Sequence, residues 1–382
     1  MDTITQGLLG AVTGQLGFRQ KIGRETSYVA AIAAVLPDLD ILLQPFVTLS
    51  GAEYEHYEQY NHAVMHRGLT HSLLFVPVAA ALLAGTWWWF RRNGTHRKSF
   101  GLLFACMFAA QLSHPLLDWC TSYGTQLLSP FTSQRYALDL LPIVDFVYTP
   151  LLVLTLLSCY VVRRATKQST RATLTTAWIG FALSLAYVTL AAVNHQRAIA
   201  FAAAQWQQED AHYATLQQPD KATTISKTHT ARLDKQKIYR AYPQIGMAFL
   251  WRVTCFDGQH WQAGRVNLLY DKSVRTFENT RVRAPDNHWV ADACQTAMGR
   301  QFQWFAMGQV RAEYARQDDR HVVVLHDMRY GLSPASMESL WPAQITFSSK
   351  DNASGTERIV LGHHDRSMAE LTGKMWRQIW TP

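Results

Sequence analysis

Ionisable side chains occur in pairs at four separate places in the N-terminal half of the chain, each inside or beside a run of apolar residues. The segments are LPDLD, MHRGLTHS, QLSHPLLDWCTSYG and DLLPIVDF, and the paired residues are Asp38, Asp40, His66, His71, His114, Asp118, Asp139 and Asp145. An ionisable group at the centre of a membrane helix costs ~2.5–3.5 kcal/mol, so such groups are candidates for function. His114 and Asp118 are four residues apart, which places both on one face of a helix.

Imidazoles and carboxylates packed together without a partner would lose hydration and repel, and a divalent cation removes both problems. A mixed His and Asp donor set suits Zn²⁺, with Mn²⁺ and Fe²⁺ as alternatives, and is too rich in nitrogen for a dedicated Ca²⁺ site. A bound metal ion lowers the pKa of a water ligand toward ~7 and so supplies a nucleophile for hydrolysis. We therefore predict that Asp38, Asp40, His66, His71, His114 and Asp118 converge in one coordination sphere or in an adjacent pair of spheres, with one or two metal ions.

Further residues are expected around this site. Arg67 would lie beside it and could hold an anionic substrate group such as a phosphate. Asp145 is predicted as a further ligand or as the base that orients a water molecule. His62 is four residues before His66 and could also reach the site, although NHAVMH is loop-like. The expected hydrogen-bond donors to the ligands are Thr70, Ser72 and Thr121.

Each pair also has a purely structural interpretation. Asp38 and Asp40 could cap a helix or a turn. His114 and Asp118 could form a hydrogen-bonded pair inside an apolar helix. Asp145 could be a helix N-terminal charge that the macrodipole favours. The metal site is preferred because all of these groups come at the same end of their apolar segments.

Six apolar segments must position these residues: about 4–18, 28–48, 69–90, 100–120, 144–162 and 174–194. The last four, of ~17–25 residues, could each cross a bilayer as a helix. The first two could be tilted spans, re-entrant helices or helices packed against the bundle. We expect an α-helical polytopic membrane bundle of about 4–6 apolar helices, followed by a small soluble β-rich α+β domain.

The predicted domain boundaries follow from a change in composition, from long apolar segments to short runs of β-branched and aromatic residues. Residues 1–195 form the predicted membrane domain, 196–236 a helix and linker, and 237–382 a β-rich domain. Its expected strands lie in FLWRVTCF, HWQAGRVNLLY, VRTFENTRV and HVVVLHDMRY, with a helix around Trp289–Gly308. Cys255 and Cys294 could form a disulfide there if the compartment is oxidising.

The distribution of basic residues predicts the orientation. If the N-terminus is outside and all six segments cross, the inner loops hold Arg19, Lys21, Arg24, Arg91, Arg92, Arg97, Lys98, Arg163, Arg164, Lys167 and Arg171. The outer loops before the second domain hold only Arg67 and Arg135. Positive residues favour the cytoplasmic side, so the β-rich domain is expected outside the cytoplasm. The net charge of +8 is spread evenly, and we expect no nucleic-acid partner.

The first 160 or so residues resemble the YdjM-like family of membrane-bound metal-dependent hydrolases. The resemblance runs from MDTITQGLLGAVTG through PDLD, HRGLTHS and HPLLDWCTSYGTQLLSPF to IVDFVYTP. It implies a multi-pass inner-membrane protein with a hydrolase site at the six predicted metal ligands. Many members have a histidine where this chain has Gln6, so the site could hold one ligand fewer, or Gln6 could be a hydrogen-bond donor. The β-rich domain contains no motif of that family.

Two functions of different classes are compatible with these residues. One is a metallohydrolase acting on a phosphoester or other ester, small or lipid-linked, at the outer face of the inner membrane. The alternative is a non-enzymatic metal-binding membrane protein whose β-rich domain recognises a partner. A transporter fits less well, because the charges lie at one membrane face and not at the midplane. A coordination position left open for water would distinguish a catalytic metal from a structural one.

Overall fold

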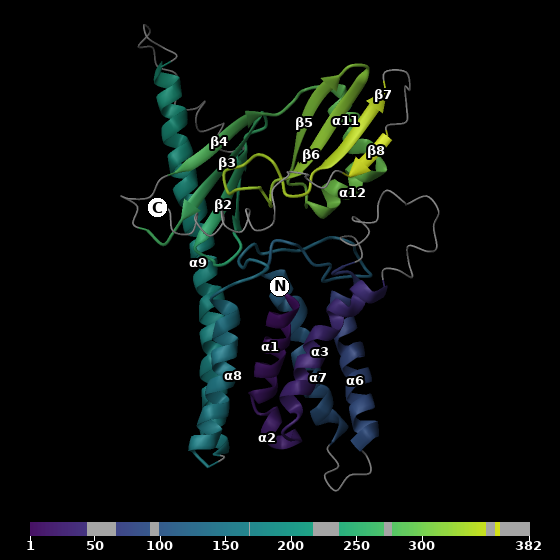
Figure 1. The fold of residues 1–382 in the computed structure, drawn as a ribbon, viewed down its shortest axis with the longest axis vertical. Coiled ribbons are helices and arrows are strands. Elements are labelled where there is room, and N and C mark those ends of the chain that lie inside the picture. The colour runs from purple at the N-terminus through teal and green to yellow at the C-terminus, as the bar shows by residue number, and fades with distance from the viewer. Residues whose placement is uncertain are drawn as a thin grey trace. The chain divides into compact units, whose positions relative to one another are not determined.

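The computed structural model describes residues 1–43, 66–91, 99–167, 169–216, 237–270, 277–348 and 356–359. Its contacts divide the chain into two units: unit 1 is Met1–Ala191 with Ile245–Met247, and unit 2 is Ala192–Gln244 with Ala248–Pro382. Unit 1 is helical and unit 2 contains the sheets, so the predicted order of a helical region followed by a β-rich region is confirmed (Figure 1). His62, the second-rank candidate ligand, lies outside the described residues.

Unit 1 begins with three short helices that pack closely together. They are α1 (Thr3–Gln15), α2 (Phe18–Ile22) and α3 (Thr26–Val35). Asp2 caps α1 by accepting a hydrogen bond from the backbone N–H of Thr5 at 2.9 Å. A Cβ at Gly10 would lie 2.4 Å from Ala34 Cβ, so only glycine permits this approach of α1 to α3. At ~1.5 Å per residue, neither α1 nor α3 is long enough to cross a ~30 Å hydrocarbon layer alone.

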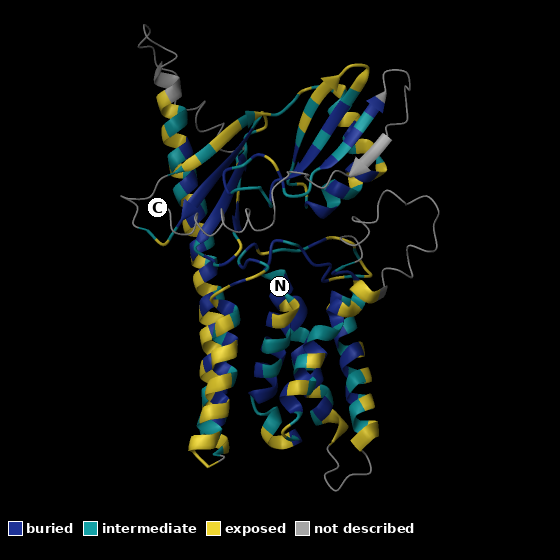
Figure 2. Ribbon diagram, viewed as in Figure 1, coloured by how far each residue is buried: buried dark blue, intermediate teal, exposed yellow. Residues whose placement is uncertain are grey.

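Four longer helices complete unit 1 and lead into unit 2. They are α6 (Phe75–Arg91), α7 (Phe100–Trp119), α8 (Tyr148–Ala165) and α9 (Thr170–Leu216). Among the described residues, two helices are long and apolar enough to cross a membrane: Phe100–Trp119 and Thr170–His212. Large apolar side chains are exposed along α6, α8 and α9, for example Leu82 (66%), Leu154 (59%) and Ile179 (56%) (Figure 2). Exposed faces of this kind are the reverse of a water-soluble helix pattern.

Irregular segments connect these helices and carry most of the predicted site. Two are 3₁₀ helices, η1 (Leu36–Leu43) and η2 (Leu69–His71), and the third is the connection from α7 to α8. Backbone hydrogen bonds fix this connection: Leu73 N–H donates to Leu127 O, and Leu140 N–H donates to Cys120 O. The three segments therefore form an ordered end to the helical unit.

Unit 2 contains two antiparallel four-stranded sheets, with strand orders β1-β2-β3-β4 and β5-β6-β7-β8. The strands are β1 (Ile238–Pro243), β2 (Leu250–Phe256), β3 (His260–Asn267), β4 (Glu278–Arg283), β5 (Val310–Gln317), β6 (Arg320–Asp327), β7 (Ala343–Ser348) and β8 (Thr356–Ile359). The single helix expected around 289–308 is two helices, α11 (His288–Gln295) and α12 (Ala297–Phe305). They are separate because the Thr296 hydroxyl caps α12 at Gly299 N–H, 3.0 Å away.

The predicted disulfide in unit 2 is wrong. Cys255 and Cys294 are both free thiols. Cys255 is buried in β2 of the first sheet, whereas Cys294 belongs to α11, which packs against β5 and β6 of the second sheet. The two cysteines are held on different layers, which sequence separation alone does not reveal.

Candidate metal centre

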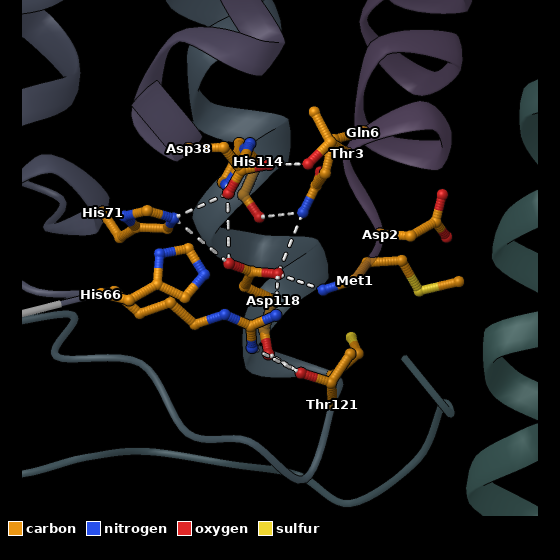
Figure 3. Close-up of polar contacts among 12 residues, drawn as sticks. Met1, Asp2, Thr3, Gln6, Asp38, His66, His71, His114, Asp118 and Thr121 are labelled. Atoms are coloured by element: carbon orange, nitrogen blue, oxygen red, sulfur yellow. Dashed lines mark hydrogen bonds and ion pairs between the residues drawn. The ribbon is translucent and has the colours of Figure 1, made fainter. Parts of the chain in front are cut away.

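The last turn of α7 supplies two of the predicted ligands. His114 and Asp118 are both fully buried, and their facing atoms, Nε2 and Oδ2, are 3.5 Å apart (Figure 3). His114 Nδ1 lies against the carbonyl oxygen of Ala34 in α3, so Nδ1 carries the proton and Nε2 is left as an acceptor. The predicted i, i+4 spacing therefore does place an imidazole and a carboxylate on one face of this helix.

Asp38 approaches the same point from η1. Its Oδ1 lies 3.4 Å from His114 Nε2 and 3.3 Å from His71 Nε2. Its other oxygen, Oδ2, accepts a hydrogen bond from the Thr3 hydroxyl at 2.7 Å. Asp38 thus has one oxygen held by α1 and one directed toward the two imidazoles.

His71 completes the group from η2. Besides Asp38, its Nε2 faces Asp118 Oδ2 at 3.6 Å. Its Nδ1 lies 3.0 Å from the Thr70 hydroxyl and 3.5 Å from Asp40 Oδ2. The four facing atoms, which belong to Asp38, His71, His114 and Asp118, have neighbouring separations of 3.3–3.6 Å. Atoms bound to one tetrahedral ion at ~2.0–2.2 Å are about 3.3–3.6 Å apart.

Asp118 shows why this group fits a metal ion. Its Oδ1 accepts hydrogen bonds from Gln6 Nε2 and from Arg67 Nη2, each at 3.0 Å, and from the amino group of Met1 (Figure 3). Its Oδ2, like His114 Nε2, is buried and has no hydrogen-bond partner among the described residues. Buried polar atoms of a native protein are almost always satisfied. A cation between the two would satisfy both.

The other two predicted ligands form a second, overlapping group. Asp40 Oδ1 lies 3.0 Å from His66 Nδ1, and Asp40 Oδ2 accepts a hydrogen bond from Thr70 at 3.1 Å. Ligand atoms of Asp40, His66 and His71 lie within 4.8 Å of one another, as do those of Asp38, His71 and His114. Five of the six predicted residues therefore form two sets of three that share His71. The sixth, Asp118, lies beside the first set, with Oδ2 3.5 Å from His114 Nε2 and 3.6 Å from His71 Nε2.

The protonation states of Asp38 and His71 suit metal binding. Asp38 and His71 both lie in 3₁₀ segments, outside the two helices long enough to cross a membrane. Burial opposes ionisation of Asp38, but the neighbouring imidazoles of His114 and His71 hold its pKa well below the usual range. Burial lowers the pKa of His71 to about 4, despite its hydrogen bond with Asp38. An ionised carboxylate and a neutral imidazole are the forms that coordinate metals.

Arg67 is held beside this cluster in a strained conformation. Its φ of 62° is in the left-handed region, which costs a non-glycine residue about 1 kcal/mol or more. Its guanidinium is buried, donates to the Thr121 hydroxyl at 2.8 Å and lies 4.7 Å from the centre of the Tyr123 ring. Its Nε has no hydrogen-bond partner among the residues described. Residues on both sides of the turn at Arg67, His66 and His71, face the carboxylate of Asp40.

Asp145 and Ser72, also expected at the site, form hydrogen bonds elsewhere. Asp145 accepts hydrogen bonds from the backbone N–H groups of Val147 and Tyr148, at the start of α8, and from the Tyr187 hydroxyl. These contacts match the helix-terminal interpretation, and none of them connects Asp145 with the cluster. Ser72 donates to the backbone carbonyl of Leu69 instead of to a ligand.

Two contacts of the cluster come from α1. Gln6 donates to Asp118 Oδ1 at 3.0 Å and is therefore a hydrogen-bond donor in this structure, one of the two roles expected for it. Thr3, which orients Asp38, is absent from the predicted set. Its position three residues before Gln6 on one face of α1 is the signal that could have identified it.

No curated protein and no solved structure matches this chain. The model of one family, described as YdjM inner membrane protein, matches residues 1–198, which include every residue of the cluster. The match covers more than half of the 382 residues. The chain therefore belongs to the YdjM inner membrane protein family.

Proposed function

We propose that this protein is a membrane-bound, metal-dependent hydrolase that cleaves an ester, best fitted by a phosphoester, with Zn²⁺ as its metal ion. The observation that carries the proposal is the pair of buried, unpartnered atoms His114 Nε2 and Asp118 Oδ2, which face Asp38 and His71. Two imidazoles with two carboxylates favour Zn²⁺ over Ca²⁺ or Mg²⁺, whereas Mn²⁺ and Fe²⁺ would accept the same donors. Family membership supports an inner-membrane location.

The chain's own residues would divide the work. When bound, the metal ion supplies a Lewis acid and acidifies a water ligand. Arg67, held by Asp118 and Thr121, keeps Nε free for an anionic oxygen of the substrate. Asp40 lies against His71 Nδ1 and His66, so it orients both rings and can accept a proton from either. Thr3 and Gln6 fix the carboxylates of Asp38 and Asp118.

The same geometry supports a second candidate function. Four protein ligands complete a tetrahedral ion and leave no place for water, whereas three ligands leave one position open. If Asp118 stays with Arg67 and Gln6, the site is open and suits hydrolysis. If all four residues coordinate, the protein is a non-enzymatic metal-binding membrane protein whose β-rich unit recognises a partner.

The proposed setting follows from the basic residues of the loops. We place four membrane crossings at α6, α7, α8 and α9, the loops 91–98 and 163–171 in the cytoplasm, and unit 2 outside it. The cluster then faces the outer surface, where a small-molecule or lipid-linked ester would reach it. A reporter fused after Pro382 tests this topology, and cytoplasmic behaviour of the reporter would contradict it.

The central experiment measures metal and activity together on the full chain in detergent. Metal content is determined, and phosphodiester and phospholipid substrates are screened, for the natural protein, His114→Ala and Asp118→Ala. His260→Ala, the same change in β3 far from the predicted ligands in sequence, is the matched control. We expect both cluster variants to lose metal and hydrolysis while still entering the membrane fraction. Stoichiometric metal in both variants would refute the site, and metal with no hydrolysis would favour the second candidate.

A further inference from the structure

A cavity of about 170 Å³ lies at the end of unit 1 away from the metal cluster. It is lined by Arg19 and Arg24 around α2, by Arg163 near the end of α8, and by Thr170 and Thr173 in the first turn of α9. In Figure 1, α2 is at the opposite end of α1 from the N-terminus, whose amino group contacts Asp118. One water molecule occupies roughly 30 Å³, so the cavity has room for an anionic group with some of its hydration.

Among the residues that the structure describes, only Glu25 places a carboxylate near the positive charges of this cavity. Arg163 donates to the side-chain oxygen of Gln15 at 3.0 Å, and Arg19 donates to the carbonyl of Arg24, so neither is paired with a carboxylate. Glu25 forms its ion pair with Arg91 at 2.6 Å, so its single charge is shared between Arg91 and Arg19 and leaves the three arginines of the cavity in excess. Burial lowers the pKa of Arg19, and the nearby charge of Arg163 lowers it further.

The start of α9 adds to this positive field. The first N–H groups of a helix have no intrahelical acceptor, and the macrodipole favours an anion there. Thr170 and Thr173 lie in that first turn and line the cavity together with the arginines. Guanidinium groups and a helix N-terminus together are the donors that hold phosphate oxygens in proteins.

Apolar side chains are exposed next to these charges. Tyr160 (54%) and Val161 (59%) lie one turn or less before Arg163 on α8, and Trp178 (51%) lies on α9. Arg164 covers the Tyr160 ring at 5.5 Å, a contact typical of a membrane interface. In a member of an inner-membrane family, such a surface meets acyl chains while the arginines meet headgroups.

We propose that this cavity binds the phosphate headgroup of an anionic phospholipid, with the acyl chains along the exposed faces of α8 and α9. Basic pockets between helices at the cytoplasmic side are recurrent sites for such headgroups. The site is independent of the hydrolase proposal, because it lies at the other end of unit 1 and shares no residue with the metal cluster.

The test is thermal unfolding of the full chain in detergent with added phosphatidylglycerol, phosphatidylcholine or inorganic phosphate. We compare the natural protein with Arg19→Gln/Arg163→Gln, and use Lys21→Gln/Arg171→Gln as the control that removes two exposed basic residues of α2 and α9 outside the cavity. Each basic side chain near an anionic lipid surface contributes about fivefold to binding, so the double variant should bind phosphatidylglycerol ~25-fold more weakly. Native mass spectrometry of the same samples counts the bound lipids.

We expect phosphatidylglycerol to raise the Tm of the natural protein and of the control, and to have little effect on the cavity variant. The Tm of each variant in phosphatidylcholine shows whether it is folded. An equal phosphatidylglycerol effect in both double variants would overturn the proposal. A full stabilisation by inorganic phosphate alone would also overturn it, because the ligand would then be the free anion.

Discussion

Two buried clusters of charged residues, one in each unit, show opposite degrees of hydrogen-bond satisfaction. In unit 2, Arg329 forms a two-pronged ion pair with Asp327, at 2.6–3.2 Å. Arg252 donates to the carbonyls of Met328, Ser333 and Pro334 at 2.8–3.1 Å. In unit 1, His114 Nε2 and Asp118 Oδ2 have no hydrogen-bond partner among the described residues. The comparison teaches that buried charge alone does not indicate a binding site, whereas converging buried atoms without hydrogen-bond partners make a group of residues a candidate for one.

The largest expected effect is a loss of stability when the buried ion pair of Arg329 and Asp327 in unit 2 is broken. Asp327→Asn leaves the buried Arg329 without a full partner, which typically costs ~3–5 kcal/mol of unfolding free energy. Chemical denaturation of the full chain, followed by tryptophan fluorescence, measures this loss. Metal content should not change. Asp292→Asn, an exposed aspartate of α11, is the control and should be neutral. If Asp327→Asn lost its metal, the charged residues of unit 2 would also affect metal binding, and the contrast between the two clusters would not hold.

The next prediction concerns the candidate metal cluster of unit 1 and tests which carboxylate orients its imidazoles. Asp40→Asn removes the charge that orients His71 and His66 without removing any of the four atoms that face one another. We expect metal affinity to fall ~10–100-fold, the usual effect of losing an orienting carboxylate. Competition with a chelating dye measures it. Asp145→Asn is the companion variant and should bind metal normally, since its bonds go to α8 and Tyr187. An equal loss at Asp145 would place that residue in the site.

A third prediction concerns the packing that brings Thr3 and Gln6 to the cluster. Gly10→Ala adds a Cβ that would lie 2.4 Å from Ala34 Cβ and 2.6 Å from Ala30 O. Overpacking of this kind costs ~1–3 kcal/mol. Gly85→Ala in α6 meets nothing within 4 Å and should be neutral or slightly stabilising. Thermal unfolding distinguishes the two variants by sign, and the opposite pattern would contradict the close approach of α1 to α3.

The smallest effect expected is a pH dependence in unit 2. Burial and the charge of Arg311 lower the pKa of His326 to about 4, and its Nδ1 accepts the Ser339 N–H at 3.2 Å. The unfolded chain, with an ordinary pKa of about 6.5, therefore binds the proton first as pH falls. Stability present above pH ~6.5 is lost progressively toward pH ~4. His326→Gln should flatten this part of the Tm profile, and an unchanged slope would exclude His326 as its cause.

The shared helix face of His114 and Asp118 could be predicted from the sequence, and so could the β-strands after residue 237. Both features depend on residues that are close together in the chain. The choice between one coordination sphere and two adjacent ones could not be made from the sequence, because a two-residue spacing does not say which way Asp38 and Asp40 each face. The same limit applies to Thr3, which reaches Asp38 across 35 positions of the chain. Asp145 looked like a ligand because helix-terminal and metal-binding aspartates share one sequence signal.

The position of His71 in both sets has a consequence for stoichiometry. A neutral imidazole has a single lone pair, and its second nitrogen carries the proton. His71 can therefore serve the group with Asp38 through Nε2 or the group with Asp40 through Nδ1, but not both at once. Occupancy of one group must weaken the other, and thermodynamic reciprocity makes the antagonism equal in both directions. A titration of the protein with metal should then saturate at a single tightly held equivalent, with any second equivalent bound much more weakly.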